Sequence, residues 1–204
     1  EEELNAEQKH ALLITLAYSR HRNAGTELTF GHTKSEKMIH LFENYANINL
    51  NRNPIKDAAG PNHFEKVVNV IEPLAKKEKY FSITKEDKRY TYGFAPNSFK
   101  GIKKLESQLN PLQRRKVEEI ISLFLMENTE QSELFATVFA GWNNLILRGE
   151  EINDESIVYE SRENWHPDKL KIDRSKFFDT ITKLRVANIV PNGIGKLVDK
   201  KTLF

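Results

Sequence analysis

Hydrophobic residues recur at three- and four-residue spacing in two consecutive runs near the middle of the chain. The first run covers residues 112–126 and the second covers residues 134–146. This spacing places each apolar set on one helix face, so it predicts two amphipathic helices that both need partners. Asn128 lies between them and is suited to cap the second helix, with Gln131 in position to bond back. We therefore expect a helix pair over 112–148 at the centre of the fold.

The same spacing predicts helices in the first half of the chain. The first covers residues 1–22, and Gly25 shortly after it favours termination of the helix. This helix is expected to be a connector that continues upstream. Thr33 is expected to cap the second helix. A third helix begins near Asn62, after a loop, with a kink at Pro73.

Alternation of aromatic and polar residues then replaces the helical spacing. Residues 80–84 and 89–94 flank a charged turn, which is typical of two antiparallel strands in a hairpin. Helices followed by a hairpin indicate a winged-helix-like unit over residues 26–96. A helix over residues 97–109 then leads into the central pair.

The last third of the chain repeats this order in a shorter form. A helix capped by Asn153 or Asp154 and a later helix capped by Asp173 precede two short apolar runs. An Asn-Gly pair at 192–193 separates these runs, and this pair is a strong hairpin signal. We therefore expect a second wing over residues 189–198.

Together these elements predict a mainly α fold. It is a helical bundle around the central helix pair, with two small winged-helix-like β-hairpins. We expect a connector helix (1–25), a first unit (26–110) with its hairpin at 80–94, and a second unit (111–204). The two units are expected to form one compact domain.

Composition indicates a soluble cytoplasmic protein. The 204 residues are 39% hydrophobic, which is enough to bury a core, and no apolar run is long enough to span a membrane. The chain has no cysteine, so nothing suggests a secreted, disulfide-stabilised protein. Its net charge is only +2, so any contact with nucleic acid must come from a local basic patch.

Several short motifs carry a family resemblance. Residues 33–41 (TKSEKMIHL) and 57–61 (DAAGP) are similar to the Panacea-type antitoxin domain. The second half resembles a C-terminal accessory region of type I and related restriction-modification subunits, whether DNA methylase or endonuclease. The motifs that carry this second resemblance are TEQSE (129–133), AGWNNL (140–145), ENWHPDK (163–169) and IVPNGIGK (189–196).

The resemblance implies a non-catalytic accessory domain that docks another subunit or domain of a restriction-modification complex. The parent protein would belong to a DNA methyltransferase or endonuclease system. We find no Asp/Asn-Pro-Pro-aromatic motif for methylation and no glycine-rich cofactor loop after a strand, so we expect no cofactor and no activity from this chain alone. The alternative is an antitoxin-like or adaptor module that binds another protein.

A third hypothesis is a metal-dependent nuclease. Asp57 with Glu86 and Lys88 mimics a nuclease spacing, although charged residues are expected in the hairpin turn anyway. The six histidines show no pair at ligand spacing on a predicted helix, so we expect no metal site. Trp142 and Trp165 are interpreted as packing residues, not as platforms for stacked bases.

Basic residues are the remaining candidates for a functional site, because Lys and Arg can contact the phosphates of DNA. One group of basic residues lies before and within the central pair, and another lies around the expected second wing. The alternative to DNA contact is that these residues form an ordinary solvated surface. The candidates for DNA contact are Lys100, Lys103, Lys104, Arg114, Arg115 and Lys116, followed by Arg174, Lys176, Thr180, Lys183 and Lys196.

Overall fold

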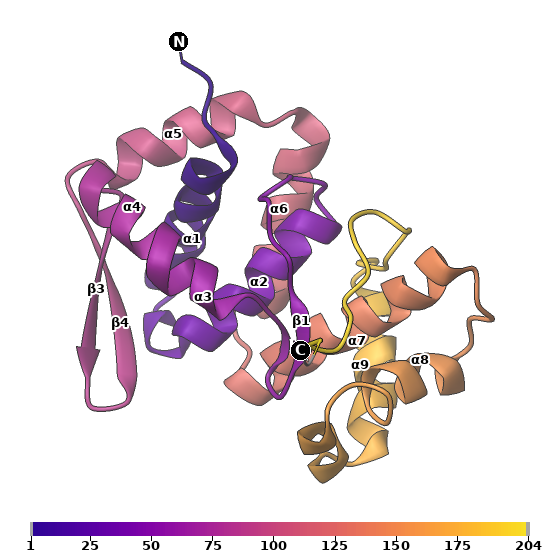
Figure 1. Ribbon diagram of the computed structural model, residues 1–204. Coiled ribbons are helices and arrows are strands. Elements are labelled where there is room, and N and C mark those ends of the chain that lie inside the picture. Colours follow the sequence, from indigo (N-terminus) through magenta and orange to yellow (C-terminus); the bar gives the residue numbers. More distant parts are fainter. Residues whose placement is uncertain (1, 203–204) are drawn as a thin grey trace.

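The computed structural model describes residues 2–202 and is mainly helical, with two small antiparallel two-stranded sheets (Figure 1). The expected fold class is confirmed. Glu1 of the expected connector helix and residues 203–204 of the expected second unit lie outside the described residues. The longer helices are α1 (Ala6–Asn23), α2 (His32–Asn44), α5 (Ser98–Gln108), α6 (Pro111–Phe124), α7 (Thr129–Arg148), α8 (Asp154–Ser161) and α9 (Arg174–Val186).

The first helix is a core element and not an exposed connector. Asn5 and Gln8 cap each other's backbone N–H groups, so α1 begins at Ala6 instead of near the first residue. Every side chain over residues 10–19 is buried, and α1 packs against α2, α4 and α5. A helix buried on all sides cannot act as a solvated linker.

The helix near Pro73 is continuous but irregular. It runs through α3 (Phe64–Lys66), η2 (Val67–Ile71) and α4 (Glu72–Glu78). The central part is a π turn, in which the N–H of Glu72 bonds the carbonyl of Val67, five residues back. Proline lacks an N–H and its ring crowds the carbonyl four residues earlier, so a wider turn accommodates Pro73. A π turn is therefore present just before Pro73, the residue at which the sequence predicts a kink.

Two hairpins lie in the first half of the chain. β3 (Phe81–Glu86) and β4 (Arg89–Phe94) form the expected hairpin, closed by a two-residue loop in which Asp87 has a φ of 55°. β1 (Ile55–Asp57) and β2 (Gly60–Asn62) pair inside the segment that the sequence predicts to be a loop. Sequence reasoning misses this short pairing because neither strand is long enough to show an alternating pattern.

The two predicted central helices are present as α6 and α7, and α2 packs against both of them. Asn128 accepts a hydrogen bond from the Gln131 N–H (2.9 Å) and caps α7, as expected, but the Gln131 side chain donates to Thr180 on α9 instead of completing a capping box. α7 packs against α2, α8, α9 and β2. One large cluster of buried apolar residues joins elements from both halves of the chain.

The C-terminal helices begin where the sequence predicts. Asn153 accepts a bond from the Ser156 N–H and caps α8, and Asp173 accepts one from the Ser175 N–H and caps α9. A short 3-10 helix, η3 (Pro167–Lys171), separates them. Trp142 and Trp165 are both buried, which confirms their interpretation as packing residues.

The expected second wing is wrong. Residues 189–198 form no hairpin, and the segment 189–200 lies across α7 as an irregular strap. The strap's strand-like contact is made with β1, where the Lys56 N–H bonds the Asp199 carbonyl (2.8 Å). The Asn-Gly signal marks a bend with Gly193 at a φ of 81°, and the flanking apolar runs do not pair with each other.

Two asparagine side chains on α7 hold this strap. Asn143 accepts a bond from the Gly193 N–H (2.9 Å) and donates to the Ile194 carbonyl (2.8 Å). Asn144 bonds both the N–H and the carbonyl of Val198 in the same way, each at 2.9 Å. A side-chain amide has the donor and acceptor of a peptide, so the two asparagines replace a partner strand.

The core also encloses charged and polar groups around α2. The backbone at Gly31 precedes the helix without a side-chain cap, so Thr33 is not the cap that the sequence predicts. Arg52 is fully buried and donates to Glu36 (2.5 Å) and Glu43 (3.3 Å). Lys37 is also buried, and it donates to the Pro61 carbonyl at 2.8 Å.

Buried histidines give the fold an acid-sensitive core. Burial lowers the pKa of His10 well below its ordinary value, and the nearby Arg52 and Lys66 lower it further. Burial and Arg52 lower the pKa of His40 in the same way. These rings are neutral in the folded state but protonate in the unfolded chain below a pH of about 6.5. The free energy of unfolding is therefore highest above that pH and falls as the solution is acidified.

Replacing His10 with Leu should remove part of this acid sensitivity. The wild type should lose roughly 2 kcal/mol per buried neutral histidine between a pH of about 7.5 and a pH of about 5, and the variant should lose that much less. Chemical denaturation at both pH values measures the difference. An equal acid loss in both proteins would mean that His10 is charged in the folded state.

Replacing Asn144 with Ala should loosen the strap, because it leaves the buried backbone groups of Val198 without partners. We expect a loss of about 1–3 kcal/mol in the free energy of unfolding and faster amide exchange at Val198. Asn192→Ala is the matched control, because this asparagine is exposed on the strap itself. Equal stability of the two variants would contradict the assigned role of Asn144.

Candidate functional site

The first group of predicted DNA-contact residues lies on two successive helices. Lys100, Lys103 and Lys104 are on α5, and in the described part of the chain none of them forms an ion pair. α6 runs in a different direction from α5 (Figure 1), so the sequence cluster is divided between two helix surfaces.

The basic residues of α6 differ in their surroundings. Arg114 is exposed and has no ion-pair partner among residues 2–202, whereas Arg115 pairs with Glu119 at 3.4 Å. Lys116 donates to the Tyr45 carbonyl (3.3 Å) and lies 4.5 Å from the centre of the Tyr45 ring. Lys116 is thus a packing residue, and the cations of this group without an ion-pair partner in the described chain are Arg114 and the three lysines of α5.

The second group is engaged within the protein. Arg174 pairs with Glu155 (2.7 Å) and with Glu163, and Lys176 pairs with Glu130 at 2.6 Å. This part of α9 therefore meets carboxylates of neighbouring segments, and its cations are partly neutralised. The absence of a second wing from the described chain removes the reason to align these residues with a DNA groove.

The remaining residues of the second group also have partners. Thr180 is buried against α7, where it accepts a bond from Gln131, so its prediction as a DNA-contact residue is wrong. Lys183 donates to the same Gln131 (2.9 Å), and Lys196 reaches Asn53 at 3.4 Å. The polar first turn of α7 thus binds α9, an interaction that helical periodicity alone does not predict.

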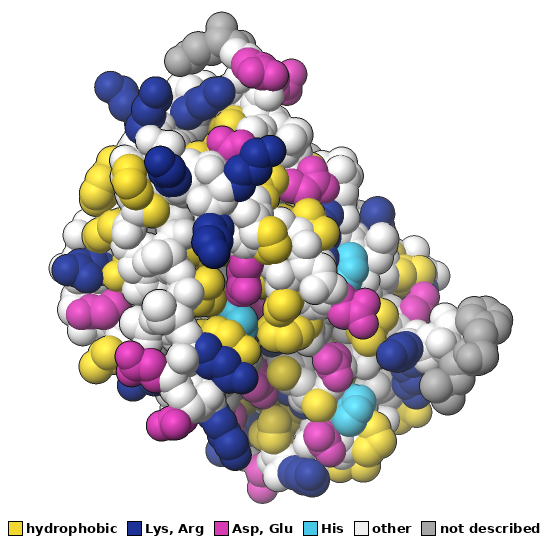
Figure 2. All heavy atoms as spheres, turned by 60° about the vertical axis from the view of Figure 1, so that its left-hand side comes forward, with side chains coloured by type: hydrophobic (Ala, Val, Ile, Leu, Met, Phe, Trp, Pro, Cys, Tyr) yellow, Lys and Arg dark blue, Asp and Glu magenta, His cyan; other side chains and the backbone are white. Residues whose placement is uncertain are grey.

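The segment around the β3–β4 hairpin is also basic. Residues 72–106 contain nine Lys and Arg and five Asp and Glu, a net charge of +4, although the whole chain carries only +2. Figure 2 shows Lys and Arg side chains spread over the hairpin side of the molecule, with apolar side chains between them. This mixture of apolar surface and positive charge makes the hairpin side the candidate site.

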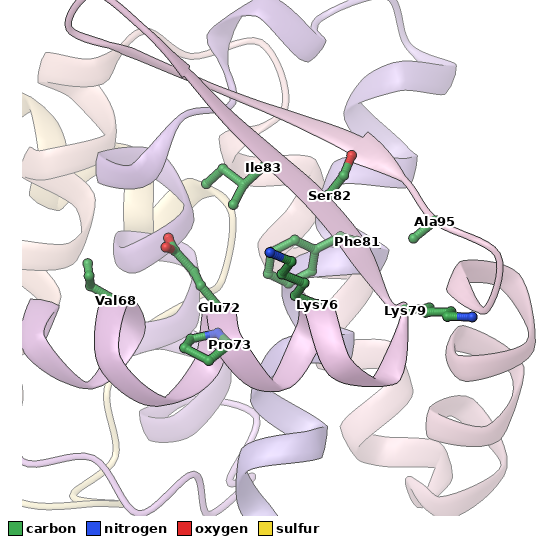
Figure 3. Close-up of a pocket in the computed structure, with 9 residues that line it drawn as sticks. All are labelled: Val68, Glu72, Pro73, Lys76, Lys79, Phe81, Ser82, Ile83 and Ala95. Atoms are coloured by element: carbon green, nitrogen blue, oxygen red, sulfur yellow. The ribbon is translucent and has the colours of Figure 1, made fainter.

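A groove of about 600 Å³ opens on this side between the α4 helix and β3 (Figure 3). Its lining is mostly apolar. The lining residues are Val68, Glu72, Pro73, Lys76, Lys79, Phe81, Ser82, Ile83 and Ala95. The groove therefore has an apolar floor with lysines from the helix on one side and a β-strand on the other.

The π turn gives the groove part of its apolar wall. The sequence predicts that Phe64 and Val68 point inward, but they remain 42% and 38% exposed. Val67 and Ile71, which the same spacing also predicts to point inward, are buried as expected. The extra residue in the π turn changes which side chains face the core, so Val68 lines the groove.

The hairpin is fixed in place by its inner face. Phe81 and Tyr92 are buried, and the Tyr92 ring lies 5.1 Å from that of Phe30. Ser98 at the start of α5 donates to the Tyr80 carbonyl (2.6 Å) and accepts from the Ala95 N–H (2.8 Å). These bonds close the end of the hairpin that meets α5, so the groove is a preformed feature.

A His–Glu pair separates the groove from a second cavity. The Glu72 carboxylate accepts a hydrogen bond from Nε2 of His32 at 2.5 Å, and the His32 ring stacks on Tyr90 with centroids 3.7 Å apart. His32 and Tyr90 line the second cavity, about 450 Å³ in volume, with Lys88 and Arg89. The His32 contact fixes the position of the Glu72 carboxylate, which lines the groove.

The residues of the nuclease hypothesis lie in different hairpins. Asp57 ends β1, where its carboxylate accepts bonds from the Ala58 N–H (2.8 Å) and the Asn62 side chain (2.9 Å). Glu86 and Lys88 lie at the tip of the other hairpin. Within residues 2–202 no group of three or more His, Asp or Glu side chains could hold a metal ion. The Asp57 carboxylate therefore stabilises the tight turn between β1 and β2.

Comparison with known proteins gives no further guide. The scan against family models, the search of curated proteins and the search of solved structures each found no match to this chain. In the described part of the chain, no helix has the length and apolar character needed to cross a bilayer. The functional argument therefore depends on the groove and its surroundings.

Proposed function

We propose that this chain is a non-catalytic accessory module of a cytoplasmic DNA restriction-modification protein, and that it docks another subunit or domain of that complex. The groove between α4 and β3 is the docking surface. The observation that carries the proposal is the combination of an apolar floor and exposed lysines on one preformed surface. The sequence motifs of the second half supply the restriction-modification context.

The energetics favour a polypeptide partner over a small molecule. Val68 is 38% exposed and leaves apolar surface in water at the groove, and covering such surface is favourable by about 25 cal/mol per Å². Lys76 and Lys79 beside this surface favour a partner with acidic groups and disfavour basic ones. An open groove with these properties selects a partner by shape and charge without any reaction taking place in it.

DNA contact is a second function, supported by a separate observation. Lys100, Lys103, Lys104 and Arg114 have no carboxylate partner among the described residues and are free to meet phosphates. Phosphate contacts carry no sequence information, so this binding is expected to be weak and nonspecific.

The docking proposal predicts that Val68→Asp abolishes binding to the methylase or endonuclease subunits of the parent complex. A carboxylate in the groove reduces its apolar surface and places a charge where the partner should pack. Val70→Asp is the matched control, because Val70 lies on the same π turn and is 43% exposed but does not line the groove. Affinity is measured with the purified full chain and purified subunits.

We expect at least a roughly tenfold weaker affinity for Val68→Asp and near wild-type binding for Val70→Asp. Equal binding by the two variants would contradict docking through the groove. Copurification with a toxin protein, and not with restriction-modification subunits, would favour the antitoxin-like adaptor instead. DNA nicking that requires Mg²⁺ and disappears in Asp57→Ala would favour the nuclease.

The DNA hypothesis is tested by replacing Lys100, Lys103, Lys104 and Arg114 together with Ala. The slope of log K against log salt should flatten by about 0.9 for each phosphate that the variant no longer neutralises. Lys176→Ala with Lys183→Ala is the control, because both lysines already have partners on α7 and should contribute little. If affinity and slope are unchanged in the first variant, these residues do not bind DNA.

A further inference from the structure

The outer edge of β3 has backbone hydrogen-bonding groups without partners in the described part of the fold. β3 and β4 form a sheet of only two strands, so each strand has one free edge. The register pairs Glu86 with Arg89 across the two-residue loop, and hydrogen-bonded and non-hydrogen-bonded pairs alternate from there. Ile83 and Lys85 therefore direct their N–H and C=O groups away from β4.

Nothing else in the described chain uses these groups. No hydrogen bond from outside the hairpin reaches the backbone of residues 81–86 within the described part of the protein. Such an edge is normally protected in a monomeric protein, because it can pair with any extended chain. Here the edge borders an apolar groove, with Phe81, Ser82 and Ile83 lining one side of it (Figure 3).

The groove offers a place for side chains beside this edge. In Figure 3, Val68, Glu72 and Pro73 lie along the helix and Ile83 lies on the strand across from them. A strand added to β3 would direct alternate side chains to opposite faces, so every second one would meet this apolar lining. Backbone bonds would supply affinity, and the groove would select the side chains.

The charges around the groove specify the chemistry of the ligand. Lys76 and Lys79 line it and Lys85 extends from β3; none of the three forms an ion pair in the part of the chain described. The carboxylate in the groove, Glu72, already accepts a bond from His32. An acidic ligand would therefore meet three available cations against this one carboxylate.

We infer that the groove binds an extended acidic segment of a partner polypeptide, which adds to the β3 edge as a third strand. Its apolar residues cover Val68 and Ile83, and its acidic residues pair with Lys76, Lys79 and Lys85. This inference rests on the proposed docking function and adds the mode of recognition. β3 has six residues, so the bound segment matches it with about six residues of its own.

The test compares two substitutions at one position. Lys85→Ala removes the side-chain charge but keeps the backbone N–H, whereas Lys85→Pro removes the N–H as well. Proline is tolerated on an edge strand where the N–H points to solvent, so the hairpin should persist. Circular dichroism and amide exchange at Thr91, which is paired with Thr84, check this. The probe is a labelled peptide of about seven residues whose odd positions, which share one face of a strand, carry both Val or Ile and Glu or Asp, with Ser or Thr at the even positions.

Strand addition predicts that Lys85→Pro binds this peptide about three- to tenfold more weakly than Lys85→Ala, the effect of one missing hydrogen bond. A second probe avoids any change in the protein: the same peptide N-methylated at alternate amides should fail to bind in one of its two methylation registers. Equal binding by the two Lys85 variants together with binding of both methylated peptides would overturn the inference. Self-association that disappears in Lys85→Pro would also overturn it, because a second copy would then occupy the edge.

The outcomes separate this inference from the docking function. If Val68→Asp abolishes subunit binding while Lys85→Pro and Lys85→Ala bind the peptide and the subunit equally, the groove docks its partner without strand addition. If neither Val68→Asp nor Lys85→Pro affects subunit binding, the docking function fails as well.

Discussion

The fold depends on the burial of α2, a helix that carries charged residues on nearly every side. An unpaired charge in a protein interior costs several kcal/mol, so each of these residues requires a partner. Lys34 donates to the Glu127 carbonyl (2.9 Å) beyond the end of α6. Glu36 accepts from Arg52, and Lys37 donates to the carbonyl of Pro61. These partners fix the α6–α7 turn and the segment that contains β1 and β2 against one helix.

This arrangement also supports the candidate site. The Tyr92 ring of β4 lies 5.1 Å from Phe30, just before α2, and His32 in the first turn of α2 holds Glu72 at the groove. The hairpin and α4 are thereby both fixed to the same helix terminus. The groove between them does not require an induced fit, so most of its ordering cost is met when the chain folds.

Helical spacing and capping residues predict much of this fold. Asn128, Asn153 and Asp173 cap their helices as expected because a cap is a local interaction. The strap could not be predicted in this way, since Asn143 and Asn144 bond to residues 51 and 54 positions further along the chain. The groove could not be predicted either, because it depends on a π turn that exposes Val68. For the candidate site, the sequence predicts the hairpin, but Lys76 and Lys79 of the groove are not among the basic residues that it singles out.

The central claim is that β3 presents an unused strand edge beside a preformed groove. Residue-resolved amide hydrogen exchange of the unliganded chain tests it most directly, because exchange reports whether each N–H is bonded. We predict slow exchange at Ser82 and Thr84, which face β4, and fast exchange at Ile83 and Lys85. Protection of Ile83 and Lys85 equal to that of their neighbours would show that the edge is already occupied and would contradict the account.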